Sequence, residues 1–354
     1  MRIVRPERGS FRSVLILLIA AGAAIPGFSQ DMLPLRLSIV TPWPSKLIVW
    51  VAENERLYDK NGLRVEIYTP PNSAEDFKRV TGITVPGQYV RQTALSPVTI
   101  GGGTPGIVRR AADARARKTV IITSADNWAN WFILAGQNIG RPEQLKGKRL
   151  GHSGNISHFH AMLFLKTMGW DSKSDISLIP DVEHLDHLVN GSVDAFVAND
   201  IVTFMARSRG YRPVVEMGDW KVPMTISGIT ADQDWLQGNR ETMRRLVKSY
   251  VEAIGLMKRN KQVAIRAMVK YWNITDPELQ DWFYERGVTL VPRKPYPNVA
   301  GIRKTMELYD SPGMRKHKPE DFYDDSFVRE LDQSGYIDSL YSGPARATAS
   351  RSSN

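Results

Sequence analysis

Short apolar runs alternate with longer amphipathic stretches from residue 33 to residue 226. The runs have the length and residue types of strands, and they lie at Leu35–Val40, Leu63–Tyr68, Val98–Ile100, Thr119–Ser124, Trp131–Ala135, Arg149–Leu150, Ser177–Ile179, Ala195–Ala198 and Val214–Val215. Helices are expected at Lys46–Asp59, Ile107–Ala116 and Val182–Asn190, whereas the Pro, Asn and Ser residues after Tyr68 favour a loop. This alternation predicts an α/β protein with mainly parallel sheets.

After Ser227 the pattern changes to helices. The segment Arg240–Lys258 places six apolar residues on one face at helical spacing: Met243, Leu246, Val247, Tyr250, Ile254 and Met257. A second helix is expected to begin at Asp276-Pro277-Glu278, with proline at its first position, and Phe327–Leu331 belongs to the last one. These apolar residues are predicted to form core, not a cofactor site.

The segment Gln144–Trp170 passes from a basic turn into a short strand, a Gly/Ser/Asn turn and an apolar helix that ends at Gly169. Asn155 or Ser157 is expected to cap this helix. The N–H groups of its first turn, with Ser153 beside them, would favour a carboxylate, sulfonate or phosphate. An ordinary strand–turn–helix connection explains the same pattern equally well.

The first 29 residues have the features of a cleavable secretory signal peptide. Four arginines precede the apolar run Val14–Ile25, and Gly27 and Ser29 are the small residues expected before a cleavage site. The run is too short to span a bilayer, which needs about 20 residues. Because the chain contains no cysteine, it is not a lipoprotein and has no disulfide or thiolate chemistry. We therefore expect an exported protein of the periplasm.

Removing that segment takes away four arginines and one glutamate and lowers the net charge from +10 to +7. The remaining positive charge is scattered along the chain, which favours attraction of small anions over nucleic-acid binding. The rest of the chain is long enough for two ordinary hydrophobic cores, so two lobes are expected. Only Gly343–Asn354 has the composition of a disordered tail.

Four phrases resemble the type II periplasmic solute-binding proteins of ABC importers, in the group that binds nitrate, sulfonates, taurine, bicarbonate and the thiamine pyrimidine precursor. They are VAENERLYDKNGLRV at residues 51–65, LKGKR at residues 145–149, LVNGSVDAF at residues 188–196, and Phe322-Tyr323 with Gly335-Tyr336-Ile337-Asp338 near the end. The phrases occur in the family's order, behind the signal peptide and with the helical pattern from Arg240 onward.

The resemblance implies two α/β lobes joined by two crossovers, with the ligand in the cleft between them. Residues 33–130 with 227–340 would form the first lobe and residues 131–226 the second. The strand-to-helix loops of both lobes would face the cleft, as ligands do at the carboxyl ends of parallel strands. The resemblance also implies a protein without catalytic activity, cofactor or metal, expected as a monomer that delivers its solute to ABC permease subunits.

In the first lobe, these loops contain Trp43, Ser45, Lys46, Gly102 and Thr104 as candidate ligand-binding residues. Trp43 lies between two prolines, where a large aromatic has little core to join. Lys46 suits an anion, although a lysine at a helix start is usually solvated. Glycine at residues 101–103 permits close backbone approach to a ligand or simply forms a turn.

Near the crossover and in the second lobe, the candidates are Trp128, Trp131, Ser153, Asn155, Ser157, Asn199 and Asp200. The two tryptophans would cover an apolar group or pack between the lobes. Asp200 would meet an amine on the solute, as the family often has an acidic residue there, or it would cap the following helix.

Two departures from the family affect the predicted ligand. A glycine-rich segment at residues 101–106 replaces the expected Asp-containing strand end, and the stretch Thr81–Ser96 is long and polar. A small anionic or zwitterionic organic solute, such as a sulfonate, a taurine-like compound or a carboxylate, is the resulting prediction.

Two other function classes remain as alternatives. Five of the six histidines lie between His152 and His187, which raises a metal-binding protein, although His158 and His160 point to different sides of a helix. The sequence Gly151-His152-Ser153-Gly154-Asn155 is similar to a nucleophile elbow but has Asn155 where glycine is required. A pyrimidine-precursor binding or biosynthetic relative is the other alternative.

Overall fold

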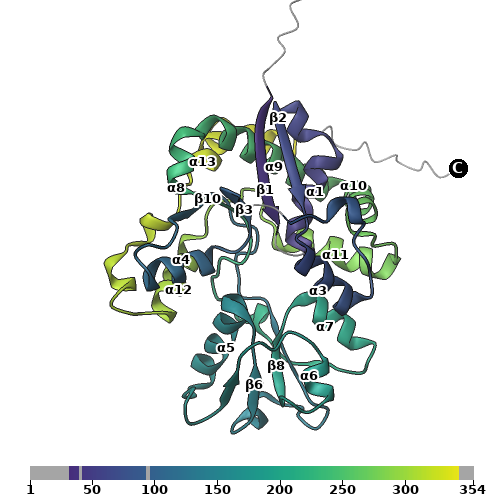
Figure 1. Cartoon of the computed structure of the whole chain (residues 1–354), viewed down its shortest axis with the longest axis vertical. Helices are drawn as coiled ribbons and strands as arrows, with labels where there is room; N and C mark the ends of the chain where they lie inside the picture. Colours follow the sequence, from purple (N-terminus) through teal and green to yellow (C-terminus); the bar gives the residue numbers. More distant parts are fainter. Residues whose placement is uncertain (1–31, 40–41, 93–95, 343–354) are drawn as a thin grey trace, which may run out of the picture. The chain divides into compact units, whose positions relative to one another are not determined.

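The structure is a computed structural model that describes residues 32–39, 42–92 and 96–342 (Figure 1). The predicted signal peptide and the predicted tail at residues 343–354 lie outside the described residues. Helices and strands alternate as expected for an α/β protein, so the predicted fold class is confirmed. No helix within the described ranges is long and apolar enough to cross a membrane.

The first sheet has five strands in the order β2-β1-β3-β10-β4. Their bounds are β1 Leu33–Ile39, β2 Leu63–Tyr68, β3 Val98–Ile100, β4 Thr119–Ile121 and β10 Ile229–Asp232. β1 pairs in parallel with β2 and β3, whereas β10 is antiparallel to both β3 and β4. Four strands of this sheet therefore run in one direction. The fifth strand, β10, runs in the opposite direction and comes from the second half of the chain.

The second sheet repeats this arrangement in the order β7-β6-β8-β5-β9. Its strands are β5 Phe132–Ala135, β6 Arg149–Gly151, β7 Ser177–Ile179, β8 Ala195–Ala198 and β9 Pro213–Glu216. β6 is parallel to β7 and β8, and β5 is antiparallel to β8 and β9. The first strand of this sheet along the chain, β5, therefore runs opposite to the other four.

Two segments connect the sheets, at residues 122–131 and 217–228, and they pair with each other. Ala129 N donates to Val222 O at 2.8 Å, and Ala125 N donates to Ser227 O at 2.8 Å. A bridge joins Trp128 to Pro223 between them. The two crossing segments therefore form one two-stranded connection, which supports our proposal of lobe boundaries near residues 130 and 227.

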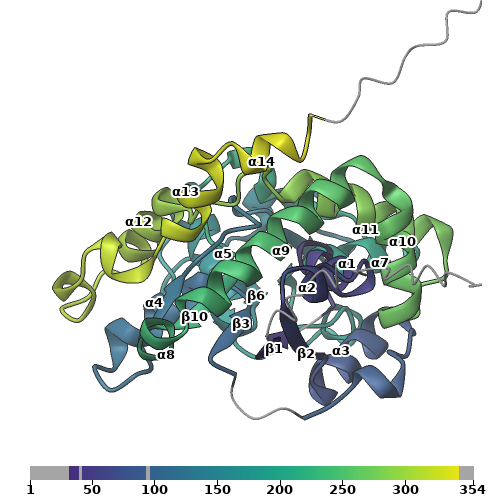
Figure 2. The ribbon, with the colours of Figure 1, turned by 90° about the horizontal axis from the view of Figure 1, so that it is seen from above.

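Helices cover both sheets (Figure 1). Their bounds are α1 Leu47–Asn54, α2 Leu57–Lys60, α3 Pro71–Thr81, α4 Gly103–Ala112, α5 Gly154–Met168, α6 Asp186–Val189, α7 Asp200–Arg207, α8 Gln233–Gly238, α9 Arg240–Arg259, α10 Lys261–Ala267, α11 Pro277–Leu290, α12 Val299–Leu308, α13 Ser326–Gln333 and α14 Tyr336–Ser339. The predicted stripe of α9 is buried against α1, α2 and α13 (Figure 2). Asp276 caps α11 by accepting from Leu279 N, as its position before Pro277 predicts.

Three predictions for the first sheet's surroundings were wrong. The segment after Tyr68 forms α3 instead of a loop, because Pro71 occupies the first turn, where it needs no N–H, and Phe77 packs into the core. The helix expected at Lys46–Asp59 is broken by Arg56, whose φ of 55° lies in the left-handed region. The prediction of helices after Ser227 also missed β10, whose four residues alternate between apolar and polar but form a very short run directly before a helix.

The glycine-rich segment is not a plain loop, because α4 begins inside it at Gly103. A Cβ at Gly102 would lie 2.5 Å from Ile226 O, and a Cβ at Gly103 would lie 2.3 Å from Ile121 Cδ1. These glycines are needed because the start of α4 packs directly on the crossing segment and on β4.

Two predictions in the second half were also inaccurate. α5 begins at Gly154 with Ser153 as the preceding residue, so Asn155 and Ser157 are inside the helix and do not cap it. The helix expected over residues 182–190 is limited to the four residues of α6. This single turn is enough to bury Leu188 together with Leu185, which precedes it.

Candidate functional site

A cavity of about 400 Å³ lies where the connections of both sheets meet. Its walls come from the residues before α1, from α3, from the N-terminal ends of α4, α5 and α7, and from Ile226 and Ser227 of the crossing segment. This volume is within the range of about 300–1,000 Å³ typical of small-molecule sites. The cavity therefore has the position and the size of a solute-binding site.

Two tryptophans form an aromatic wall of the cavity. The ring centroids of Trp43 and Trp131 are 5.8 Å apart, and Trp131 stacks on His160 at 5.1 Å. Burial lowers the pKa of His160 to about 4, so the ring is neutral and Nδ1–H donates to Ile156 O at 2.8 Å. A neutral stack of this kind suits the apolar body of a small organic molecule.

Three hydrogen-bond donors at the cavity have no acceptor within the part of the chain that the structure describes. The ammonium group of Lys46 donates no hydrogen bond there, although the side chain is only 9% exposed. Ser227 Oγ and Trp131 Nε1 are buried and also lack a partner among the described residues. Because buried donors are normally satisfied, these two residues of the cavity lining are candidates to bind an acceptor supplied by a ligand.

The N-terminal ends of three helices border the same space. Gly101 and Gly102 precede α4, Ser153 and Gly154 begin α5, and Asn199 precedes α7. Neither α4 nor α5 has a side-chain cap, whereas the Asn199 side chain accepts from Val202 N at 2.9 Å. Helix N-termini favour negative charge by about 0.3 to 2 kcal/mol each, depending on burial.

A buried charge network lies behind Lys46. Ser45 donates its hydroxyl hydrogen to Asp126 Oδ2 at 2.9 Å, and Arg286 of α11 pairs with Asp200 at 2.6 Å. Burial raises the pKa of Asp126 to about 7 and that of Asp200 to about 6. Burial also lowers the pKa of Lys46 to about 8, against the opposing effect of Asp126. The ion pair of Asp200 and Arg286 joins α7 on the second sheet to α11, which packs beside the first.

Half of the candidate residues named from the sequence line this cavity: Trp43, Lys46, Gly102, Trp131, Ser153 and Asn199. Two others lie behind the wall. Ser45 and Asp200 belong to the buried charge network, and Asn155 lies in the first turn of α5.

Three further candidate residues do not line the cavity. Thr104 is fully buried and donates to Thr225 O at 3.2 Å, which fixes α4 to the crossing segment. Ser157 is buried inside α5, with no partner for Oγ among the described residues. Trp128 is 44% exposed in the crossing segment and does not line the cavity.

Sequence reasoning missed the contribution of α3 and of the segment before α6. Ser73, Asp76 and Phe77 line the cavity from α3, and Glu183 and His184 line it from the second sheet's side. The spacing of Ser73, Phe77 and Val80 is helical, so the pattern was present, but the prolines and Asn72 made a loop the stronger interpretation.

The histidines predicted as an alternative metal cluster do not come together. His152 and His158 are neighbours, with ring centroids 4.9 Å apart, and His158 Nδ1 lies 2.9 Å from the Tyr309 hydroxyl. His187 pairs with Ser192. Only His184 joins a group of metal-ligating side chains in the described residues, together with Asp76 and Glu183.

Comparison with known proteins identifies the fold of the chain. The chain has the two-lobe fold of type II periplasmic binding proteins, as the sequence resemblance predicted. Residues 104–264 match the model of the family described as NMT1/THI5 like. None of the curated proteins matches the chain in sequence.

Several solved structures share the fold at low sequence identity. The nitrate-binding protein NrtA from Synechocystis PCC 6803 is 11% identical with a TM-score of 0.64, covering 89% of this chain and 93% of that one. The aliphatic sulphonate binding protein SsuA from Escherichia coli is 17% identical with a TM-score of 0.57, covering 78% and 85%. The desulfurization enzyme DSZB is 16% identical with a TM-score of 0.51, covering 84% and 99%. At these identities the likeness shows the fold.

Proposed function

We propose that the protein is the solute-binding component of an ABC importer and captures a small anionic or zwitterionic organic solute, such as a sulfonate or a carboxylate. This proposal rests on one cavity whose lining includes Lys46, Ser227 and Trp131. An acid group of the solute would accept hydrogen bonds from these donors, and its body would pack on Trp43 and Trp131. The binding proteins for nitrate and sulphonate that share the fold support the same class of ligand.

Around Lys46 the electrostatics favour the acid group over a neutral ligand, whereas Asp76 and Glu183 give another part of the cavity wall negative groups. Lys46 is charged at neutral pH because its pKa, although lowered by burial, is about 8. The N-terminal ends of α4, α5 and α7 add partial positive charge around the same space. An anion placed there would supply a hydrogen-bond acceptor to the Lys46 ammonium group, which has none among the described residues.

The proposal includes export to the periplasm, cleavage after residue 29 and delivery to a membrane permease. The basic and apolar pattern of the first 29 residues supports export. The fold supports delivery, because its two lobes and paired crossing segments allow a bound and an unbound form that a permease can distinguish. N-terminal sequencing of the protein from a periplasmic fraction tests the cleavage site.

A thermal-shift screen of the purified protein against sulfonates, taurine, nitrate, bicarbonate, carboxylates and pyrimidines tests the ligand class. A solute at 100 times its dissociation constant stabilises the folded state by about 2.7 kcal/mol, a shift of several degrees. The Lys46→Met variant should lose the shift, and Lys148→Met, which removes an exposed lysine, should keep it. Absence of any shift with anionic solutes, or equal shifts in both variants, contradicts the proposal.

Chromatography of the solute recovered after incubation separates binding from catalysis. We expect the solute to be recovered unaltered and in full. Conversion of a sulfonate or sulfinate during incubation would instead favour an enzyme, the class represented among the shared folds by the desulfurization enzyme DSZB.

A further inference from the structure

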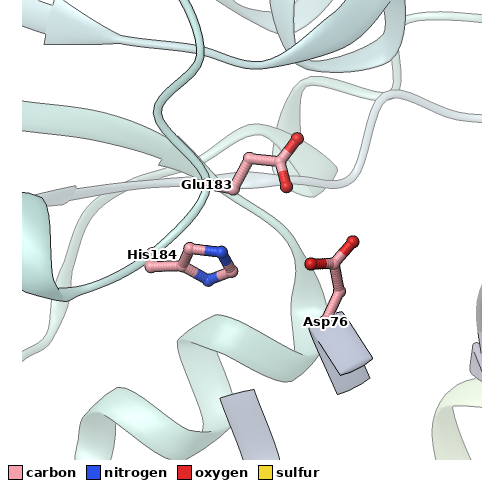
Figure 3. Close-up of side chains that lie close together, drawn as sticks. All are labelled: Asp76, Glu183 and His184. Carbon is pink, nitrogen blue, oxygen red and sulfur yellow. The ribbon is translucent and has the colours of Figure 1, made fainter. Parts of the chain in front are cut away.

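Three metal-ligating side chains face one another at the edge of the cavity (Figure 3). Asp76 comes from α3, and Glu183 and His184 come from the segment between β7 and α6. One ligand atom from each residue lies within 4.8 Å of the others. The group brings together parts of the chain more than 100 residues apart, and neither the anion-binding donors nor the aromatic wall includes any of its members.

The three side chains have the chemistry of a transition-metal site. An imidazole nitrogen with two carboxylates suits Zn²⁺, Mn²⁺ or Fe²⁺, whereas Mg²⁺ and Ca²⁺ prefer oxygen ligands alone. His184 Nδ1 is buried and has no hydrogen-bond partner among the described residues.

The spacing is close to that of a formed site. Two ligand atoms about 2.1 Å from one tetrahedral ion are about 3.4 Å apart. A separation at the 4.8 Å limit therefore has to shrink by about 1.4 Å. Glu183 is exposed, and its long side chain can turn toward an ion to supply part of this adjustment.

The charge around the group also favours a dication. Arg79, one turn along α3, forms an ion pair with Asp76 through one carboxylate oxygen and leaves the other for a ligand. Arg79 and His187 are the positive or ionisable groups that oppose a cation at His184, and Glu183 and Asp76 favour it. The two carboxylates outnumber the one guanidinium, so the side chains of Asp76, Glu183 and Arg79 together bear a net negative charge that attracts a cation.

We propose that Asp76, Glu183 and His184 bind one divalent transition-metal ion, for which Zn²⁺ is the best match. The ion would link α3, beside the first sheet, to the segment before α6 on the second. Three protein ligands leave at least one coordination position open toward the cavity. This site stands on its own residues and does not require the proposed solute function.

Calorimetric titration of Zn²⁺ into the chelator-treated purified protein is the test. We expect one saturable site per chain. Asp76→Asn, Glu183→Gln and His184→Gln should each weaken Zn²⁺ binding at least about 10-fold, since even the loss of a group that only orients a ligand costs 10- to 100-fold. The matched controls Asp186→Asn and His187→Gln change the same residue types as Asp76 and His184, but in the adjoining helix α6, and should bind as the unmodified protein does.

A second measurement reports the ligand set directly. Co²⁺ bound by one imidazole and two carboxylates gives a visible absorption band that should disappear in His184→Gln and persist in His187→Gln. The proposal is overturned if no saturable Zn²⁺ binding occurs or if the control variants weaken binding as much as the three ligand variants. It is also overturned if none of the three weakens binding. Because no solute is added, these outcomes do not depend on the anion-binding proposal.

Discussion

Replacing Asp126 by asparagine should stabilise the protein at alkaline pH, although it removes a residue next to the proposed solute site. Asp126 is fully buried; Ser45 donates to Oδ2, and Oδ1 has no partner among the described residues. Burial raises its pKa from 3.8 to about 7, and Asp200 adds to this increase against Ser45, Arg286 and Lys46. Burying the charged carboxylate therefore costs the folded protein free energy. Asparagine at this position carries no charge and can still accept the hydrogen bond from Ser45, so the variant avoids this cost.

The sign and size follow from the two pKa values of this carboxyl group. The folded state binds the proton more tightly than the unfolded state, so this group lowers stability as pH rises from about 4 through about 7. An increase of about three pKa units corresponds to roughly 3 to 4 kcal/mol above pH 7. For a chain of about 320 residues this equals roughly 5 °C in Tm.

Calorimetric melting of Asp126→Asn and the unmodified protein between pH 4 and pH 8 measures the difference. The variant's advantage should be near zero at pH 4 and reach its full value at pH 8. The exposed Asp219→Asn provides the matched control and should show no such trend. A constant difference across the pH range, or a variant that melts lower at pH 8, would refute the argument that a buried charge limits stability here.

The other predictions concern the cavity, the buried ion pair and one strained glycine. Trp43→Ala should weaken solute binding by about 1 to 3 kcal/mol and, because Trp43 also belongs to the hydrophobic core, should lower Tm while the protein stays folded. Unchanged affinity by calorimetry removes Trp43 from the site. Affinity for an anionic solute should fall above pH 8, where Lys46 loses its charge, and Lys46→Met should remove this pH dependence in the same titration. Arg286→Met leaves the 1%-exposed Asp200 without its cation and should cost about 3 to 5 kcal/mol at pH 8 in urea unfolding, with a smaller loss below pH 6, where Asp200 is protonated. Gly228→Ala should lower Tm strongly, because φ is +151° and a Cβ would lie 2.0 Å from Thr123 O, whereas Gly238→Ala, with open space around it, should not.

The sequence alone determined the fold class, because the relevant patterns are local. Strands β2, β3, β7 and β8 were predicted at their observed bounds, since each is a short apolar run between turn residues. The stripe of α9 and the Asp276-Pro277 start of α11 were equally readable. The family resemblance then supplied the two lobes, which local patterns do not contain.

The tertiary structure decided which residues meet at the cavity. Trp43, Lys46 and Trp131 could be proposed from the loops that contain them, but Ser227 became a candidate only when its hydroxyl was found buried and without a partner there. Thr104 was an equally plausible candidate from its position in a strand-to-helix loop, yet its hydroxyl donates a hydrogen bond to Thr225 O. Whether a polar side chain is free for a ligand depends on neighbours distant in sequence.

The same reason explains Asp200 and the proposed metal site. The family resemblance offered Asp200 as a partner for a solute amine, with a surface carboxylate or a helix cap as the alternative. The fold instead brings Arg286 from 86 residues away to pair with it. Asp76 and His184 are also far apart along the chain, and no spacing rule joins them. Local sequence determines helices, strands and the residue types available, whereas burial and pairing, which set the charge and reactivity of each side chain, arise only when the two sheets and their helices pack together.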